Sequence, residues 1–562
     1  MQVFKKLSYS LLVLFGLTAA FTACKNDSAP DPVLSITGVS PGSAPISSTV
    51  AIAGTLFNAT PASNTVTFGG GAVATVVSAS PTQLVVTVPA NAQNGTITVA
   101  ANGQTATSTQ TFTLSARPVV TIMGSLTGTQ NWTAGNIYLM QGFVLVEDGA
   151  TLNIQPGTII KGAGKEADPS GKQQGATLIV RPGGKINAAG TAAAPIVFTS
   201  NAAAGSRKYG DWGGVVLIGK APINQPGSTN FEGGIPGTTG TFSDVADNSG
   251  VMQYCRIEFA GIALLPGSEI NGLTMYGVGS GTTIDHIQVS YSGDDSYEWF
   301  GGTVNMKYLI ALRGFDDDWD TDWGYSGKVQ YGIALRDPNV ADQSASNGFE
   351  SDNFNSGLPA TGPNAGLPLT APVFANMSNF VFSGAPSNAV TAGGSGRFQS
   401  GMHLRRNTAI SVFNSVLFGY PEGLRLDAPT GTTGTLDNAT NGALQLRGIV
   451  LANDEIPGST TTVVGAGSIT TAQAQAFFNT PAFKNEVIPS SGVAALLLNA
   501  QNFNLTAPNF LPGAGSPLLT GAIWDGKGAD GSFTKETFRG AFGTVNWTQG
   551  WANFDPQTTP YN

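Results

Sequence analysis

The sequence predicts an all-β chain in two parts, a small β-sandwich followed by a longer parallel β-helix with a C-terminal cap. Glycine and proline are dense, at 74 and 32 of 562 residues, and charged residues are only 11%, which leaves little material for amphipathic helices. Short Val/Thr-rich runs fill residues 33–115, and strand-like segments then recur from about residue 116. Recurring strand-rich segments of this kind are typical of β-solenoids.

Charge and cysteine content exclude several classes of protein. The formal net charge is −9, whereas a nucleic-acid binder needs a basic patch, so no nucleic-acid partner is expected. Two cysteines and two histidines are too few for a disulfide scaffold or a zinc cluster. Hydrophobic residues reach 41%, which is enough to bury a core and excludes disorder throughout.

Residues 1–23 have the pattern of a signal peptide. Lys5 and Lys6 form a basic start, and residues 11–21 form an apolar stretch too short to span a bilayer. With the small residues before Cys24, the pattern resembles a bacterial lipoprotein signal, although Phe21 stands where leucine is usual. The resemblance implies cleavage before Cys24, lipid attachment there, and an outer-membrane anchor that does not span the membrane. A plain secretory signal is the alternative.

Residues 24–32 form a short polar tether. Asp27 follows closely on Cys24 and resembles the export signal of surface lipoproteins in the Bacteroidetes. This resemblance implies that the protein faces the outside of the cell rather than the periplasm.

Residues 33–115 are predicted to form the sandwich, because evenly spaced short strands separated by Gly, Pro and Asn are typical of that fold. The pattern resembles the IPT/TIG family of immunoglobulin-like domains. The residues that carry the resemblance are Ile36-x-x-Val39-x-Pro41, Val50-x-Ile52-x-Gly54-x-x-Phe57, Val66-x-Phe68-Gly69, Leu84-x-Val86-x-Val88-Pro89 and Gly95-x-Ile97-x-Val99. Members of that family usually serve as spacers or binding modules.

Residues 116–430 are predicted to form the β-helix. The segment GATLNIQPG at 149–157 returns 26 residues later as GATLIVRPG at 175–183. Further strand-like runs that end in glycine follow at 256–261, 287–293, 309–314, 380–384 and 416–419. One such rung cannot bury its own apolar side, but stacked rungs bury a continuous stripe.

These rungs resemble the right-handed parallel β-helix of pectin-lyase-like proteins, and in particular secreted Bacteroidetes proteins of which many have no assigned activity. Residues 431–562 are predicted to hold the final rungs and the C-terminal cap. The aromatic stretch 538–561 is expected to cover the last rung, because solenoid ends need caps.

Acidic residues concentrate in one stretch, 285–322, which holds nine of the 35 in the chain. Asp294 and Asp316 are 22 residues apart, as are Asp295 and Asp317. A rung of that length would place Ile287 over Leu309 and Val289 over Ala311, and would stack the acidic turns. The candidate Ca²⁺ ligands are Asp294, Asp295, Asp316, Asp317, Asp318, Asp320 and Asp322.

The chemistry favours calcium because stacked carboxylates repel one another and oxygen ligands suit this cation. The run Asp318-x-Asp320-x-Asp322 has Gly324 at its seventh position and Val329 at its twelfth, so it is not an EF-hand. Two alternatives stay open: the aspartates bond local backbone N–H groups in turns, or another cationic partner neutralises them.

Aromatic residues lie among the same carboxylates. Flat rings present apolar faces to sugars and carboxylates accept hydroxyl hydrogens, so the combination predicts a glycan-binding surface. The candidate ligand contacts are Glu298, Trp299, Trp319, Trp323, Tyr325, Glu350 and Asp352. The alternative is that the rings fill the interior of the coil.

Catalysis is the other interpretation of this stretch. Pectate lyases on the resembling fold use Ca²⁺ with an arginine base, and Arg313 and Arg336 are the candidates here, although an ionised arginine is a poor base. Glycoside hydrolases need two carboxyl groups, which Asp294 and Asp316 would supply.

The sequence as a whole therefore predicts a surface lipoprotein that binds a glycan or another surface component without catalysis, with Ca²⁺ as cofactor. A Ca²⁺-assisted polysaccharide lyase or glycoside hydrolase is one alternative. An accessory subunit of an outer-membrane transporter is the other.

Overall fold

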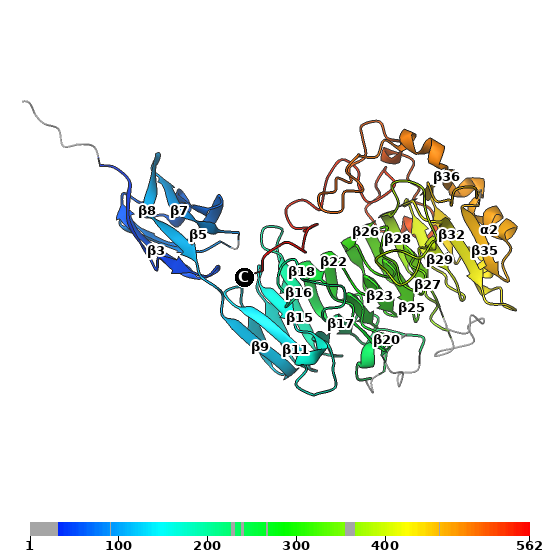
Figure 1. Cartoon of the computed structure of the whole chain (residues 1–562), viewed down its shortest axis with the longest axis horizontal. Coiled ribbons are helices and arrows are strands. Elements are labelled where there is room, and N and C mark those ends of the chain that lie inside the picture. Colours follow the sequence, from blue (N-terminus) through cyan, green and yellow to red (C-terminus); the bar gives the residue numbers. More distant parts are fainter. Residues whose placement is uncertain are drawn as a thin grey trace, which may run out of the picture.

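The computed structural model describes residues 32–89, 91–225, 231–237, 241–265, 268–353, 366–459 and 461–561. The predicted signal peptide, Cys24 and nearly all of the tether lie outside these residues. The all-β prediction is confirmed: a small antiparallel sandwich precedes a long coil of parallel strands (Figure 1). None of the described helices is long and apolar enough to cross a membrane.

The N-terminal domain is a sandwich of eight strands. One sheet has the order β1-β3-β6-β5, and β5 continues through β4 into β7 and β8. Alternating residues of these strands, such as Val50, Ile52, Val66 and Phe68, fill the core between the sheets. The strands are β1 (Ser35–Ser40), β2 (Ser43–Ala44), β3 (Thr49–Thr55), β4 (Asn64–Gly69), β5 (Ala72–Ser80), β6 (Gln83–Thr87), β7 (Gln93–Ala101) and β8 (Gln104–Leu114).

The rest of the chain winds into a coil with three faces, in which each strand pairs in parallel with the strands of the rungs before and after it. The first face carries the acidic residues. Its strands are β14 (Thr177–Val180), β17 (Gly214–Ile218), β21 (Leu273–Tyr276), β23 (Tyr297–Phe300), β25 (Trp319–Asp322), β27 (Phe349–Ser351), β29 (Ser400–Leu404), β32 (Glu422–Ala428) and β35 (Val463–Gly467).

The second and third faces share several bent strands. Those confined to the second face are β10 (Thr129–Trp132), β12 (Thr151–Ile154), β15 (Lys185–Ala189), β30 (Ser411–Phe413) and β33 (Gln445–Arg447). Those confined to the third are β13 (Ile159–Gly162), β16 (Ile196–Ser200), β31 (Val416–Phe418), β34 (Val450–Ala452) and β36 (Glu486–Ile488). Those that span both are β18 (Gly250–Glu258), β22 (Thr283–Ser290), β24 (Met306–Leu312), β26 (Lys328–Leu335) and β28 (Val373–Phe380).

Two long strands, β9 (Val119–Leu126) and β11 (Ile137–Val146), run from the third face into the first at the start of the coil. Outside the coil, β19 (Ala263–Leu265) and β20 (Ser268–Glu269) form a small hairpin.

The predicted stacking of 22-residue rungs is confirmed, since Ile287 pairs with Leu309 and Val289 with Ala311. All four side chains are buried in the central core.

The bend between the second and third faces repeats one backbone conformation. Tyr254, His286, Tyr308 and Tyr331 occupy it with φ between 49° and 65°. Their rings stack outside the coil with centroids 4.2, 4.4 and 4.9 Å apart. Asparagine takes over at the same bend in later rungs, at Asn376 and Asn414, because it tolerates the left-handed region better than most residues.

The end of the coil is covered by helices rather than by the aromatic stretch. In α2 (Thr471–Phe478), Ala474, Phe477 and Phe478 join the central core, and α1 (Gly434–Asn441) lies against β32 and α2. A capping box at Thr470 and Gln473 fixes the start of α2. The short 3₁₀ turns are η1 (Pro61–Ser63), η2 (Lys165–Ala167), η3 (Glu232–Gly234), η4 (Pro481–Phe483), η5 (Ser490–Leu496), η6 (Pro517–Leu519) and η7 (Gly526–Ala529).

The expectation that residues 538–561 cover the last rung is wrong. This stretch runs back along the third face toward the early rungs, so that the C-terminus lies near β16 and β18 (Figure 1). Trp551 packs edge-on against Tyr254 and His286, and the Tyr561 hydroxyl donates to Glu258 over 2.7 Å. The physical reason is that the third face is apolar on its outside. Ile310, Leu312, Ile333, Leu335 and Phe380 are buried there under the C-terminal segment.

We expect Trp551→Ala to lower the free energy of unfolding by about 3–5 kcal/mol, because it removes a large side chain that is 2% exposed. Thermal or denaturant unfolding measures the change. Val545→Ala in the same segment is the matched control, since Val545 is 71% exposed. Equal effects of the two substitutions would contradict the packing of this segment on the third face.

Candidate functional site

The candidate site lies on the outside of the first face and at the turns that lead into it. Asp294 and Asp295 precede β23, and Asp316 and Asp317 precede β25. Parallel register then places Glu298, Asp320 and Glu350 side by side on three successive strands. We call these seven residues the acidic cluster.

Part of the acidic cluster belongs to a ladder of hydrogen bonds between turns. The Asn271 side-chain oxygen accepts from the backbone N–H of Asp295 over 3.2 Å, and Asp295 Oδ1 accepts from that of Asp317 over 2.8 Å. Asp317 Oδ1 accepts in turn from the N–H of Asn347, and Asn347 from that of Ser400. Asn271 and Asn347 accept the same kind of hydrogen bond without carrying a charge. The ladder therefore does not require the negative charges of Asp295 and Asp317.

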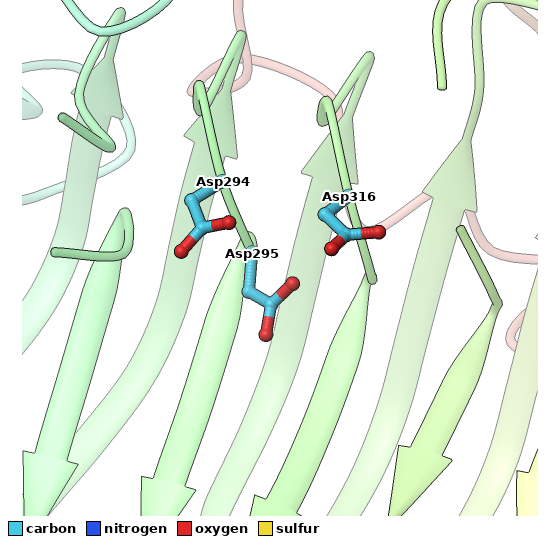
Figure 2. A group of neighbouring side chains, drawn as sticks. All are labelled: Asp294, Asp295 and Asp316. Atoms are coloured by element: carbon cyan, nitrogen blue, oxygen red, sulfur yellow. The ribbon is translucent and has the colours of Figure 1, made fainter. Parts of the chain in front are cut away.

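The carboxylates form three overlapping groups in which one oxygen per residue lies within 4.8 Å of the others. Figure 2 shows the first group, with Asp294 and Asp316 on adjacent turns and Asp295 between them. Asp295 belongs to the first and second groups, and Asp320 belongs to the second and third. They are Asp294, Asp295 and Asp316; Asp295, Glu298 and Asp320; and Asp317, Asp320 and Glu350.

Burial and mutual repulsion raise the pKa of most of these carboxyl groups. Burial is the larger cause for Asp294 and Asp295, followed by the charges of Asp316 on the first and of Asp294 and Asp317 on the second. Burial also raises the pKa of Asp316, to about 6, although a hydrogen bond from the Ser344 hydroxyl opposes it. The cluster therefore favours either bound protons or a bound cation.

Among the described residues, the ion pairs that reach the acidic cluster are made to Glu350, and the charge of Arg336 opposes the rise in the pKa of Asp316 and Asp317. Arg405 pairs with Glu350 and with Asp352, and it lowers the pKa of Glu350 to about 2 against the effect of burial. His403 lies 3.6 Å from Glu350. The strongest charge effects on the pKa of Asp294, Asp295, Glu298 and Asp320 come from other carboxylates.

Comparison with known families agrees with this architecture. An IPT/TIG domain matches residues 34–114, and a pectate-lyase-like β-helix domain matches residues 124–490, more than half of the chain. The chain belongs to the pectate-lyase-like β-helix family. The predicted combination of the two domains is thereby confirmed. A search of curated proteins finds no match.

Two solved structures from Bacteroides thetaiotaomicron VPI-5482 resemble small parts of this β-helix protein. An auxiliary nutrient binding protein is 24% identical over 16% of this chain and 22% of its own, with a TM-score of 0.15. A structural genomics protein of unknown function is 20% identical over 16% and 23%, also with a TM-score of 0.15. The β-helix protein thus spans less than a quarter of either solved chain.

The aromatic contacts predicted from the sequence are mostly inside the β-helix. Trp299, Trp319 and Tyr325 are fully buried in the core, so the prediction that they contact a ligand is wrong. The reason is strand alternation, which turns Trp299 and Trp319 inward when Glu298 and Asp320 point outward. Trp323 is half-buried outside the coil, against Phe300 at 4.7 Å.

Two predicted ligands of the metal lie outside the three carboxylate groups. Asp318 is fully buried and pairs with Arg336 over 3.2 Å, so it is a structural residue rather than a metal ligand. Asp322 belongs to the next outward row along the first face, beside Asp352. Burial, and after it the charge of Asp352, raises the pKa of Asp322 to about 8. Glu350 and Asp352 thus lie in the rows along the strands of the first face, and not in the column of turn aspartates.

Neither candidate arginine is placed to act as a base. Arg336 is fully buried and also donates to the backbone carbonyls of Asp316 and Asn347. Arg313 pairs with Asp337 over 2.6 Å and lies over the ring of Tyr291, 4.8 Å from its centroid. Both arginines hold turns together, and the neighbouring acidic groups raise their pKa against the effect of burial, which keeps them protonated.

Sequence reasoning missed carboxylates that approach the acidic cluster from other segments. Glu232 and Glu269 both raise the pKa of Asp294, and burial raises the pKa of Glu232 itself to about 7. Phe231 packs on Tyr276 at 4.3 Å and the Glu232 N–H donates to the Tyr276 hydroxyl, which holds this segment over the first face. No local signal marks these residues, because they lie in η3 and in the small hairpin of β19 and β20, outside the repeating rungs.

We expect Asp317→Asn to raise the free energy of unfolding in chelator, since the amide oxygen keeps the ladder bond to Asn347 while the charge disappears. Asp317→Ala should instead lower it by about 1–3 kcal/mol, because it leaves a buried N–H without its acceptor. Thermal unfolding of both variants measures the difference. If both substitutions destabilise the protein alike, the ladder does not hold Asp317.

The raised pKa values also predict a pH dependence for the metal-stripped protein. A carboxyl whose pKa is higher in the folded than in the unfolded chain stabilises the fold below its unfolded value of 3.8, and this contribution is lost as pH passes the folded value. With Asp316 at about 6 and Asp322 at about 8, the free energy of unfolding should fall from about pH 4 to pH 8. Unfolding curves that stay flat over this range in chelator would contradict the prediction.

Proposed function

We propose that this protein is a surface-associated, non-catalytic glycan-binding protein whose acidic cluster holds Ca²⁺. The observation that carries the proposal is the set of three overlapping carboxylate groups on the first face and its turns, in which the largest charge effects on the pKa of Asp294 and Asp295 come from other carboxylates. A cation bound there would relieve the repulsion that stacking imposes.

Calcium suits this set of donors better than other common metals do. Every member of the three groups is Asp or Glu, with no His or Cys, and hard oxygen donors favour Ca²⁺ or Mg²⁺ over zinc and copper. The groups offer several carboxylates on stacked turns and strands, and Ca²⁺ accepts more ligands in looser geometry than Mg²⁺. Asp294, Asp295, Glu298, Asp316, Asp317, Asp320 and Glu350 are the proposed ligands.

Binding is favoured over catalysis by the state of the two arginines. A lyase that follows the resemblance needs an arginine facing the substrate, whereas Arg336 is fully buried and Arg313 is committed to Asp337. In the proposed role the coil is a rigid platform that presents the first face. The lipid anchor at Cys24 and the tether would fix this platform to the outer membrane, with the IPT/TIG domain as spacer.

The test is calorimetric titration of Ca²⁺ into the metal-stripped full chain. We expect a dissociation constant on the order of 10⁻⁶ M, and a rise in the free energy of unfolding of about 2.7 kcal/mol at a hundredfold excess over it. The double variant Asp295→Asn/Asp320→Asn alters all three groups at once and should abolish binding.

Asp437→Asn is the matched control, because Asp437 is exposed in α1 and belongs to none of the three carboxylate groups, and this variant should bind normally. Titration with Mg²⁺ checks the choice of metal. Absence of Ca²⁺ binding by the unaltered chain, or equal binding by the double variant, would refute the metal site.

A further inference from the structure

The acidic cluster lacks the sugar platform that its buried tryptophans were expected to supply, and the structure has a groove beside it that offers one. This corner groove has a volume of about 700 Å³, within the range typical of ligand sites. It lies where the chain passes from the third face to the first, and residues of η2, of the segments after β16 and β18, and of the turn before β23 line it.

Stacked glycines form the floor of the corner groove. A Cβ on Gly293 would lie 2.4 Å from the Gly261 carbonyl oxygen and 2.8 Å from the Gly210 nitrogen. A Cβ on Gly210 would lie 3.0 Å from that same carbonyl oxygen. Only glycine lets these three turns approach so closely, so no side chain from them fills the groove.

The lining of the corner groove combines aromatic and uncharged polar groups. Tyr209 and Phe315 line the groove, half-buried and edge-to-face with ring centroids 5.5 Å apart. Gln141 and Asn201 add amide groups, and Ser200 donates to Asp211 over 2.5 Å. Aromatic rings with amides and hydroxyls suit the apolar faces and hydroxyl groups of a sugar.

The charged residues that line the corner groove narrow the class of ligand further. The groove lining holds one cation, Lys165, against two anions, Glu166 and Asp211, and burial raises the pKa of the Tyr209 hydroxyl so that it stays neutral. A phosphate or a polyanion needs an excess of positive groups, which this lining does not supply. A lipid needs a mostly apolar wall, which the amides and carboxylates interrupt.

The corner groove borders the acidic cluster, although no residue of the cluster lines it. Gly293 and Phe315 line it, and the residues that follow them directly in the chain are Asp294 and Asp316. A ligand lying along this corner would therefore pass from the groove to the carboxylates of the first group.

We propose that the corner groove binds a neutral oligosaccharide, held against Tyr209 and Phe315 and independent of bound Ca²⁺. The inference deepens the proposed glycan-binding function: it names the ligand class and moves the main sugar contacts from the first face to the neighbouring corner. The acidic cluster then contacts the part of the glycan that extends beyond the groove.

The test is binding of the full chain to immobilised cello-, xylo-, manno- and malto-oligosaccharides, in Ca²⁺ and in chelator. Ala202→Trp places an indole in the groove, because Ala202 lines it, whereas its neighbour Ala203 is exposed and does not line it. We expect the unaltered chain and Ala203→Trp to bind at least one of these probes in both buffers. Ala202→Trp should lose at least tenfold in affinity while its thermal unfolding matches that of Ala203→Trp.

The Asp295→Asn/Asp320→Asn variant separates this inference from the metal site. Binding that survives in this variant but is lost in Ala202→Trp supports the corner groove, whatever the calorimetry with Ca²⁺ gives. Binding that is lost in chelator and in the aspartate variant, but not in Ala202→Trp, overturns the groove and leaves the acidic cluster as the glycan site. Failure of the unaltered chain to bind any of the four probes overturns the assignment of a neutral oligosaccharide.

Discussion

Parallel pairing between successive rungs is the constraint on which the rest of this structure depends. It satisfies the backbone of every paired strand and sets residue over residue along the coil, as with Ile287 over Leu309 inside. It also repeats each corner, so that Tyr254, His286 and Tyr308 share one backbone conformation and stack their rings. A residue of one rung therefore lies next to the residue at the same position in the following rung.

The same stacking creates the electrostatic character of the first face. Glu298, Asp320 and Glu350 are neighbours because their strands are in register, and repulsion between buried carboxylates follows directly. The chain neutralises part of this charge itself, through Arg405 at Glu350 and Arg336 at Asp318. The earlier rungs keep carboxylates with raised pKa values, so the two ends of the acidic cluster differ in how their charge is offset.

Part of the site could be read from the sequence because rung length is a local property. The interval from Asp294 to Asp316 equals one rung, so the stacking of the acidic turns was predictable. The inward direction of Trp299 and Trp319 follows from alternation with Glu298 and Asp320, and could have been deduced from the same residues. The approach of Glu232 and Glu269 to Asp294 could not, because η3 and β20 lie outside the repeating rungs and follow no period from which a position can be calculated.

The sequence by itself determined the all-β class, the order of the two domains and the 22-residue rung around the acidic turns, because periodicity and turn residues are written locally along the chain. Only the tertiary structure decided which carboxylates bring their oxygens close enough together to reach one cation. It also decided which arginines are already paired and where the aromatic C-terminal segment lies. It also decided that stacked glycines leave a groove beside the acidic cluster. These features depend on contacts between segments tens to hundreds of residues apart, whose distances no local pattern encodes.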